Sequence, residues 1–341
     1  MLTIAINGFG RIGRMIVRAF YENQERYKND IKIVCINDLV SKDTCSHLLK
    51  YDTIHGVFSS DVSSCQDGIK INNDIIKIIN EPDVKNINWK DLGVDIVFEC
   101  SGRFTNKNDA IKHIESGAKK VIVSAPSEGS DRTVVFGINH TSISKEDIVV
   151  SNGSCTTNCL APIASVLHEE FGIISGFMTT VHAYTGDQRL IDSAHKDLRR
   201  ARAAAMSMIP STTGAAKAIG LVLPQLSGKL SGTSIRVPTA NVSMVDLVCI
   251  LDKPATKDKI NLSMENASSG KMRGVLAYND LPLVSTDFNH NNHSSIFDAT
   301  ETYILESNPN MVRVVSWYDN EFGFSNRMLD LASYINNTNL I

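Results

Sequence analysis

Gly8-Phe9-Gly10-Arg11-Ile12-Gly13 decides the fold of the first half of this chain, because it joins an expected strand, Thr3–Ile6, to an expected helix, Arg11–Glu22. Its glycines suit a tight turn, a close approach of the backbone to a pyrophosphate, and close contact between helix and sheet. The helix start offers free N–H groups and a positive dipole end to phosphates. A GxGxxG run alone also fits an ordinary glycine-rich turn, but this context predicts a dinucleotide-binding site.

An acidic residue follows the next expected strand, which runs over Lys32–Ile36 and is followed by Asn37-Asp38. A carboxylate at this point accepts hydrogen bonds from the ribose hydroxyls of a dinucleotide. The same carboxylate repels the 2′-phosphate of NADP. Asp38 therefore favours NAD as the cofactor.

Residues 1–150 alternate short β-branched runs with segments of helical periodicity. The expected strands are Thr3–Ile6, Lys32–Ile36, Ile96–Glu99, Lys120–Ser124, Val134–Ile138 and Ile148–Val150. The expected helices are Arg11–Glu22, Thr44–Tyr51 and Asn106–Ser116. Several strands are apolar on both faces, as parallel strands covered by helices are. The order predicts an α/β domain with a Rossmann-type parallel sheet.

The pattern changes at residue 155. A helix over Thr156–Glu170 is followed by longer alternating strands, which predict an α+β domain with a mostly antiparallel sheet and one open face. These strands are Gly176–His182, Thr233–Val237, Val242–Leu251, Met272–Tyr278 and Met311–Trp317. The segment Thr185–Ala205 is expected to be a long ordered loop of the kind that carries function. We expect a dinucleotide-binding domain over 1–154, joined by a C-terminal helix in 321–341, and a catalytic domain over 155–320.

The composition is that of a globular protein. Of 341 residues, 43% are hydrophobic and 21% are charged, and the formal net charge is -3. So small a charge gives no reason to expect nucleic-acid or membrane binding, and neither an 18-residue apolar run nor a signal-peptide pattern is present. Seven scattered cysteines argue against a disulfide framework and for a reducing compartment. A cytoplasmic protein is expected.

Ser151–Cys159, with the sequence SNGSCTTNC, lies where the two patterns meet. Cys155 is expected at a helix N-terminus, where the dipole and free N–H groups favour the thiolate. Cys159 lies one turn further and suits a core position. A disulfide between them is disfavoured, because Cβ atoms at i and i+4 lie about 5–6 Å apart and a bridge needs about 3.8 Å. Two such cysteines also make a poor zinc site, so Cys155 is the candidate nucleophile.

A catalytic thiol needs a base, and His182 is the candidate among nine histidines because it ends an expected strand just before the long loop. Its position alone favours a structural histidine over a catalytic one. His290-Asn291-Asn292-His293 has spacing that could suit a metal site on a helix. Its Asn-rich surroundings predict a surface loop instead, and no metal is expected.

Five runs of the chain resemble the glyceraldehyde-3-phosphate dehydrogenase family: INGFGRIGR, SNGSCTTNCLAP, TTVHAYTGDQ, RVPTANVSMVDL and SWYDNEFGFSNRMLDL. They span the chain in the family's order, and SCTTNC is highly specific. The resemblance implies NAD-dependent oxidation and phosphorylation of D-glyceraldehyde 3-phosphate to 1,3-bisphosphoglycerate, in glycolysis and gluconeogenesis. It also implies a homotetramer in which the Thr185–Ala205 loop packs against a neighbour's cofactor site.

The resemblance implies that Cys155 attacks the aldehyde to give a thiohemiacetal, with His182 as base and as donor to the developing oxyanion. Hydride transfer to the nicotinamide leaves a thioester, which inorganic phosphate cleaves to an acyl phosphate. Asn320 matches the residue that holds the nicotinamide amide. Further cofactor contacts are matched by Arg11, Ile12 and Ser124.

Two anion sites are implied by the same resemblance. The site for the substrate's phosphate is matched by Thr185, Asp187 and Arg236. The site for the attacking phosphate is matched by Ser154, Thr156, Arg200, Thr213 and Gly214. Hydroxyls and backbone N–H groups position phosphate oxygens, and arginine neutralises their charge in a fork. A carboxylate such as Asp187 suits a phosphate site only where it orients an arginine.

Some positions depart from the family's pattern. Gly153 replaces an alanine, which is a small change, and Pro82 stands where an arginine usually makes an adenosine-side contact. Ser193-Ala194 replaces the Leu-Pro pair of strictly NAD-dependent members and resembles photosynthetic members that also accept NADP. Leu39, after Asp38, is as in NAD enzymes. We predict that NAD is preferred and NADP is tolerated.

Two other functions stay open on the sequence. Erythrose-4-phosphate dehydrogenase is a sister enzyme that hydrolyses its thioester, and it usually loses the matches at Thr185 and at Thr213-Gly214. Both matches are present here, which favours phosphorolysis. A binding protein, for example for RNA, is the third possibility, but the chain has no basic stripe.

Overall fold

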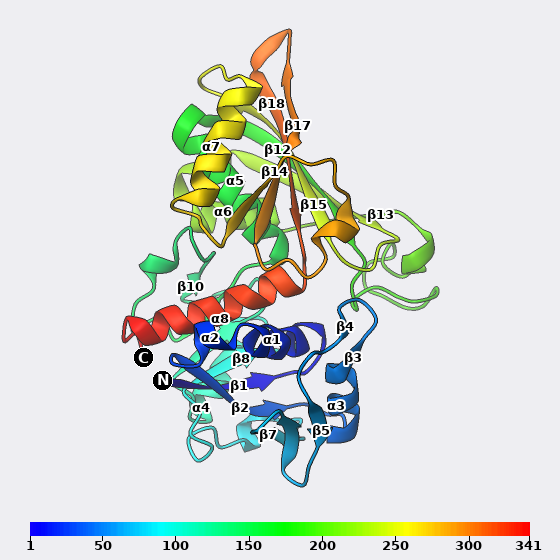
Figure 1. Ribbon diagram of the computed structural model, residues 1–341, viewed down its shortest axis with the longest axis vertical. Coiled ribbons are helices and arrows are strands. Elements are labelled where there is room, and N and C mark those ends of the chain that lie inside the picture. The colour runs from blue at the N-terminus through cyan, green and yellow to red at the C-terminus, as the bar shows by residue number, and fades with distance from the viewer. The chain divides into compact units, whose positions relative to one another are not determined.

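The computed structural model describes residues 1–341 and divides into two compact units. The first consists of Met1–Ser154 with Ser325–Ile341, and the second is Cys155–Phe324 (Figure 1). No helix is long and apolar enough to cross a membrane.

A nine-stranded sheet forms the centre of the first unit, in the order β10-β11-β9-β8-β1-β2-β7-β6-β5. Strands β10 to β7 in this order pair in parallel, and β5, β6 and β7 form an antiparallel edge. The strands are β1 Leu2–Asn7, β2 Ile31–Asn37, β5 Val62–Ser64, β6 Gly68–Ile71, β7 Asp74–Ile79, β8 Ile96–Glu99, β9 Lys120–Val123, β10 Arg132–Thr133 and β11 Val149–Ser151. A separate hairpin consists of β3 Tyr51–Asp52 and β4 Gly56–Val57.

The helices of this unit are α1 Arg11–Glu22, α2 Gln24–Tyr27, α3 Lys42–Lys50, α4 Lys107–Glu115 and, from Ser325 onward, α8 Phe322–Asn337. Side chains cap two of them: Ser41 accepts the Thr44 N–H at the start of α3, and Asn106 accepts the Asp109 N–H at the start of α4. Residues 4–6 of β1 are fully buried, as expected of a strand covered on both faces. The predicted Rossmann-type sheet is confirmed.

One predicted strand is wrong. Val134–Ile138 forms turns, in which Gly137 has a φ of +84° and the Val135 N–H donates to the Asn139 side chain. Val134 and Val135 are buried, and the Val134 N–H donates to the Ser151 carbonyl at 2.8 Å, which is the last pairing of this segment with β11. The residues that follow turn away from the sheet. The strand here is the short β10, just before this segment.

The second unit is built on a seven-stranded sheet in the order β13-β14-β12-β15-β18-β17-β16, with four antiparallel and two parallel pairings. The predicted mostly antiparallel sheet is confirmed. Its strands are β12 Ile173–Ala183, β13 Ile209–Ser211, β14 Leu230–Val237, β15 Ser243–Leu251, β16 Leu276–Asn279, β17 Ser295–Leu305 and β18 Asn308–Tyr318. Its helices are α5 Cys155–Phe171, α6 Ala215–Val222 and α7 Lys257–Ser269, which contact the sheet from one side (Figure 1).

The alternation along β15 shows why one face stays open. Val245, Leu247 and Cys249 are buried, whereas the residues between them are partly exposed and Ile250 is 38% exposed. The predicted elements do not include β13, β17, α6 or α7. The strand predicted over Met272–Tyr278 begins too early, because Met272–Val275 forms turns that include Gly274 at a φ of +79°.

Candidate functional site

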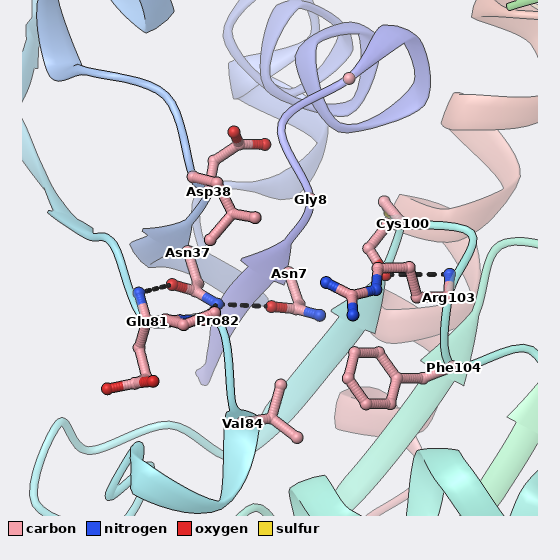
Figure 2. Close-up of a pocket in the computed structure, with 13 residues that line it drawn as sticks. Asn7, Gly8, Asn37, Asp38, Glu81, Pro82, Val84, Cys100, Arg103 and Phe104 are labelled. Carbon is pink, nitrogen blue, oxygen red and sulfur yellow. Dashed lines mark hydrogen bonds between the residues drawn. The ribbon is translucent and has the colours of Figure 1, made fainter.

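A cavity of about 260 Å³ lies at the carboxyl ends of the parallel strands of the first unit (Figure 2). This is where open α/β sheets bind ligands. It is lined by Asn7, Gly8, Gly10, Asn37, Asp38, Leu39, Glu81, Pro82, Val84, Cys100, Ser101, Arg103 and Phe104.

The glycines of the first turn fit a dinucleotide. Gly8 has a φ of +95°, and a Cβ atom there would lie 2.5 Å from the backbone of Ser101. A Cβ on Gly13 would collide with the carbonyl oxygen of Gly8, so α1 approaches the turn closely. A Cβ on Gly10 would meet nothing within 4 Å, which leaves its backbone open to a ligand. This arrangement suits the pyrophosphate of NAD.

Asp38 is held by the backbone around it. Its Oδ2 accepts the Phe9 N–H at 2.6 Å and its Oδ1 accepts the Val40 N–H at 3.1 Å. The guanidinium of Arg11 pairs with Asp52, with its Nη2 3.2 Å from Asp52 Oδ1. Arg11, like Ile12, would therefore reach a phosphate through the backbone N–H groups at the start of α1.

Several residues of this cavity received no role from the sequence. Ser101, Arg103 and Phe104 follow β8, and Val84 follows β7. The sequence feature that could have identified them is their position just beyond the ends of parallel strands, where a ligand binds. Ser124, which was predicted, is not among the lining residues; it follows β9 and donates its N–H to the Glu99 carbonyl at 3.0 Å.

The second unit brings a thiol and an imidazole together. Cys155 is the first residue of α5, and His182 is the next-to-last residue of β12. The Cys155 Sγ lies 3.5 Å from Nε2 of His182, which is 4% exposed. A nucleophile and a base at this distance form the pair that covalent catalysis requires.

The other side of the His182 ring sets its tautomer. Nδ1 lies 2.7 Å from the Ala183 carbonyl oxygen, a contact that a proton on Nδ1 would satisfy, and this tautomer leaves Nε2 facing the thiol as an acceptor. Arg236 Nη1 lies 3.0 Å from Nδ1 and donates to the same carbonyl at 3.2 Å. Burial, and next the charge of Arg236, lower the pKa of His182 to about 3, which keeps the ring neutral at pH 7.

Burial raises the pKa of the Cys155 thiol above its ordinary value. The charge of Arg236 and the N–H of Thr156 act in the opposite direction but do not cancel this effect. The N–H groups at the helix start thus favour the thiolate, as expected, while burial disfavours it. A neighbouring base that takes the thiol proton would assist attack by Cys155.

Tyr318, at the end of β18, is a further part of this site that sequence reasoning missed. Its hydroxyl lies 2.8 Å from Oγ1 of both Thr156 and Thr180, and its ring meets the His182 ring edge to face at 5.9 Å and 79°. These contacts fix one face of the imidazole.

Cationic groups converge beside the thiol. Arg236 Nη1 lies 3.5 Å from Thr185 Oγ1, and its buried Nε has no acceptor in the protein, as suits an anion site. Asp187 pairs instead with Arg200, at 2.6 Å, and with His195, at 3.5 Å. The carboxylate thus orients an arginine, the condition under which it suits a phosphate site.

Arg200 connects this ion pair to the region that precedes α6. Its Nε and Nη2 donate to Ser211 Oγ at 2.9 and 2.6 Å. Thr213 Oγ1 accepts the Ala215 N–H at 3.2 Å, and Gly214 is the N-cap of α6. A helix start, hydroxyls and a guanidinium together suit an oxyanion. Ser154, which ends the first of the two segments of the first unit, directly precedes Cys155.

Asn320 is oriented by a buried serine. Its Oδ1 accepts from Ser243 Oγ at 2.8 Å, which leaves Nδ2 as the donor for a ligand carbonyl. Ser243 Oγ also accepts the Ala183 N–H at 3.0 Å.

His290 and His293 make ordinary contacts: the former stacks on Phe322, and Nδ1 of the latter lies 2.9 Å from the Asn291 side-chain oxygen.

Comparison with known proteins gives matches over most of the chain. Residues 2–107 match the family model "Glyceraldehyde 3-phosphate dehydrogenase, NAD binding domain", and residues 154–320 match the C-terminal domain of the same enzyme. A glyceraldehyde-3-phosphate dehydrogenase of Geobacillus stearothermophilus is 53% identical over 97% of both chains. Those of Bacillus cereus and Cereibacter sphaeroides are each 52% identical, over 100% and 97% of both chains.

Proposed function

Because the chain belongs to the glyceraldehyde-3-phosphate dehydrogenase family, we propose that it oxidises D-glyceraldehyde 3-phosphate to 1,3-bisphosphoglycerate with inorganic phosphate and NAD, in glycolysis and gluconeogenesis. The observation that carries this proposal is the 3.5 Å contact between the Cys155 sulfur and Nε2 of His182. The family model that matches residues 2–107 is an NAD-binding domain, and all residues that line the cavity of the first unit belong to that range.

The first step forms a carbon–sulfur bond. The Cys155 sulfur attacks the aldehyde carbon while Nε2 of His182 takes the thiol proton and passes it to the developing oxyanion, giving a thiohemiacetal.

The second step oxidises the thiohemiacetal. Bound NAD supplies the acceptor for the hydride. Nε2 of His182 takes the hydroxyl proton as the hydride leaves, so that a thioester remains on Cys155. Asn320 Nδ2 is the donor that would hold the carboxamide of the nicotinamide.

The third step transfers the acyl group to phosphate. A phosphate oxygen attacks the thioester carbon and the carbon–sulfur bond breaks, which returns Cys155 as a thiol once a proton is regained from His182. Thr185 and Arg236 would hold the substrate's own phosphate, with Asp187 acting through Arg200. Arg200, Thr213, Gly214, Ser154 and Thr156 would hold the attacking phosphate.

A cofactor-and-phosphate matrix tests this reaction. The purified enzyme is assayed with glyceraldehyde 3-phosphate and with erythrose 4-phosphate, each with NAD or NADP and with or without phosphate. We expect steady turnover only when phosphate is present. Steady turnover without phosphate would show hydrolysis of the thioester and would favour the erythrose-4-phosphate reaction.

The same matrix tests cofactor choice. We expect a higher kcat/KM for NAD than for NADP, because the Asp38 carboxylate repels a 2′-phosphate, with measurable activity on NADP. Asp38→Ala should raise the kcat/KM ratio of NADP to NAD by about tenfold or more. Equal efficiency of the two cofactors in the unaltered enzyme would contradict the role of Asp38.

The proposal includes a cytoplasmic homotetramer with a dinucleotide-binding domain over 1–154 and a catalytic domain over 155–320. None of the seven cysteines is in a disulfide, which suits the cytoplasm.

Large apolar side chains of one segment are exposed by 72–84%: Leu190, Ile191, Leu198, Met206 and Met208. Such a patch is typical of a subunit interface. Light scattering should give a mass about four times the 37.4 kDa of the chain, and a monomer would contradict the assembly.

A further inference from the structure

A line of buried amides runs from the edge of the cavity toward Glu99, at the carboxyl end of β8. Figure 2 shows the part of this line from Glu81 through Asn37 to Asn7. The Glu81 N–H donates to Asn37 Oδ1 at 2.9 Å, and Asn37 Nδ2 donates to Asn7 Oδ1 at 2.8 Å. Asn7 Nδ2 then donates to Glu99 Oε2 at 2.6 Å. These side chains join the ends of β1, β2 and β8 and the segment after β7.

A second line reaches Glu99 from the other side. Trp89 Nε1 can only donate, and it lies 3.2 Å from Nδ1 of His113, so Nδ1 is an acceptor and Nε2 carries the proton. Nε2 donates to Glu99 Oε2 at 3.0 Å. The other carboxylate oxygen accepts the N–H of Ser101, at 2.7 Å, and its hydroxyl. Asn37 Nδ2 also donates back to the Glu81 carbonyl at 2.9 Å; the other hydrogen bonds of both lines point toward the Glu99 carboxylate.

The Glu99 carboxylate thereby fixes the backbone on both sides of the turn that contains Gly8. Asn7 precedes Gly8, and the backbone of Ser101 is the group that leaves no room for a Cβ atom on Gly8. Both Asn7 and Ser101 line the cavity, whereas Glu99, 1% exposed, does not. We propose that Glu99 is a positioning residue for NAD, which holds the turn in its binding geometry through Asn7 and Ser101. This inference rests on the binding of NAD in this cavity.

Glu99→Gln tests the proposal, because glutamine keeps the shape but replaces an acceptor oxygen by a donor. Donors that now meet at the carboxylate would be left facing an NH₂ group. We expect the Kd of NAD, and equally of ADP-ribose, to rise about 10- to 100-fold by calorimetry. The kcat at saturating NAD should change by less than about threefold, since Cys155 and His182 are untouched.

Asp95→Asn is the matched control. Asp95 directly precedes β8 at its opposite end, and its Oδ2 accepts the Thr3 N–H at 3.0 Å and the Thr3 hydroxyl at 2.8 Å. It should weaken folding without changing either Kd. An equal rise in Kd for Asp95→Asn, or unchanged Kd values in a folded Glu99→Gln enzyme, would overturn the proposal.

Trp89→Phe provides a second test should Glu99→Gln fail to fold. This substitution lies outside the cavity lining. It keeps an aromatic ring at position 89 but removes the N–H donor that sets the His113 tautomer. We expect a smaller rise in the Kd of ADP-ribose, about threefold or more, and an unchanged Kd would again overturn the proposal. Absence of ADP-ribose binding by the unaltered enzyme would instead refute the cofactor site itself.

Discussion

Cys155→Ser is expected to lower kcat by at least about 10³-fold while NAD binding stays unchanged. A serine hydroxyl is a far weaker nucleophile than a thiol, and a serine ester would resist attack by phosphate more than a thioester does. Cys155 is not among the residues that line the cofactor cavity, all of which belong to the first unit. Initial rates and calorimetry with NAD check the two parts of this expectation.

Cys159→Ser is the control for this loss. Cys159 is buried one turn along α5, where its sulfur lies 3.7 Å from Ser295 Oγ and 3.6 Å from the Ser316 carbonyl. We expect reduced thermal stability but kcat within about fivefold of the unaltered enzyme. If both serine variants lost activity equally, Cys155 would not be the nucleophile.

His182→Asn is expected to lower kcat by about 10²- to 10⁴-fold, because the thiol and the thiohemiacetal lose their proton acceptor. Tyr318→Phe serves as the comparison: it keeps the ring against His182 but removes the hydroxyl that contacts Thr156 and Thr180. Its loss in kcat should be much smaller. Near-normal turnover in His182→Asn would refute the assignment of the base.

The pH dependence follows from the same pair. His182, with a pKa of about 3, stays neutral at every pH above 5, so it should give no acid limb between pH 5 and 7. The raised pKa of Cys155 means that alkylation by iodoacetamide, without substrate, should increase with pH into the alkaline range. Arg236→Leu removes a charge that lowers this pKa, and should shift the rise to still higher pH.

The sequence predicted elements whose signal is local. The helix Arg11–Glu22 was predicted with its observed bounds, because its apolar spacing and the glycine turn before it agree. The hairpins over 62–79 were missed, since their burial pattern depends on pairing at the sheet edge and not on a repeat within each strand. The strand predicted over Val134–Ile138 was wrong for the converse reason, because buried valines next to a turn resemble the residues of a strand.

The sequence predicted which residues form the candidate site, but it did not predict their contacts or their burial. Cys155 and His182 stood out at the ends of elements, but their 27-residue separation in the chain said nothing of their 3.5 Å contact. The direction of the Cys155 pKa shift depends on how completely the fold buries the thiol, which no local motif records. Nothing in the sequence distinguishes Glu99 from other strand residues, because its hydrogen-bond partners come from distant segments.

The helix that carries Cys155 is enclosed along most of its length. Residues 156–167 of α5 are all buried, and the helix contacts strands β12, β15, β17 and β18. Its backbone amides should therefore exchange with deuterated solvent only when the whole second unit opens. Heat inactivation should then coincide with the unfolding of the second unit, and the protein should have no partly folded form in which only the first turn of α5, with Cys155, is unfolded.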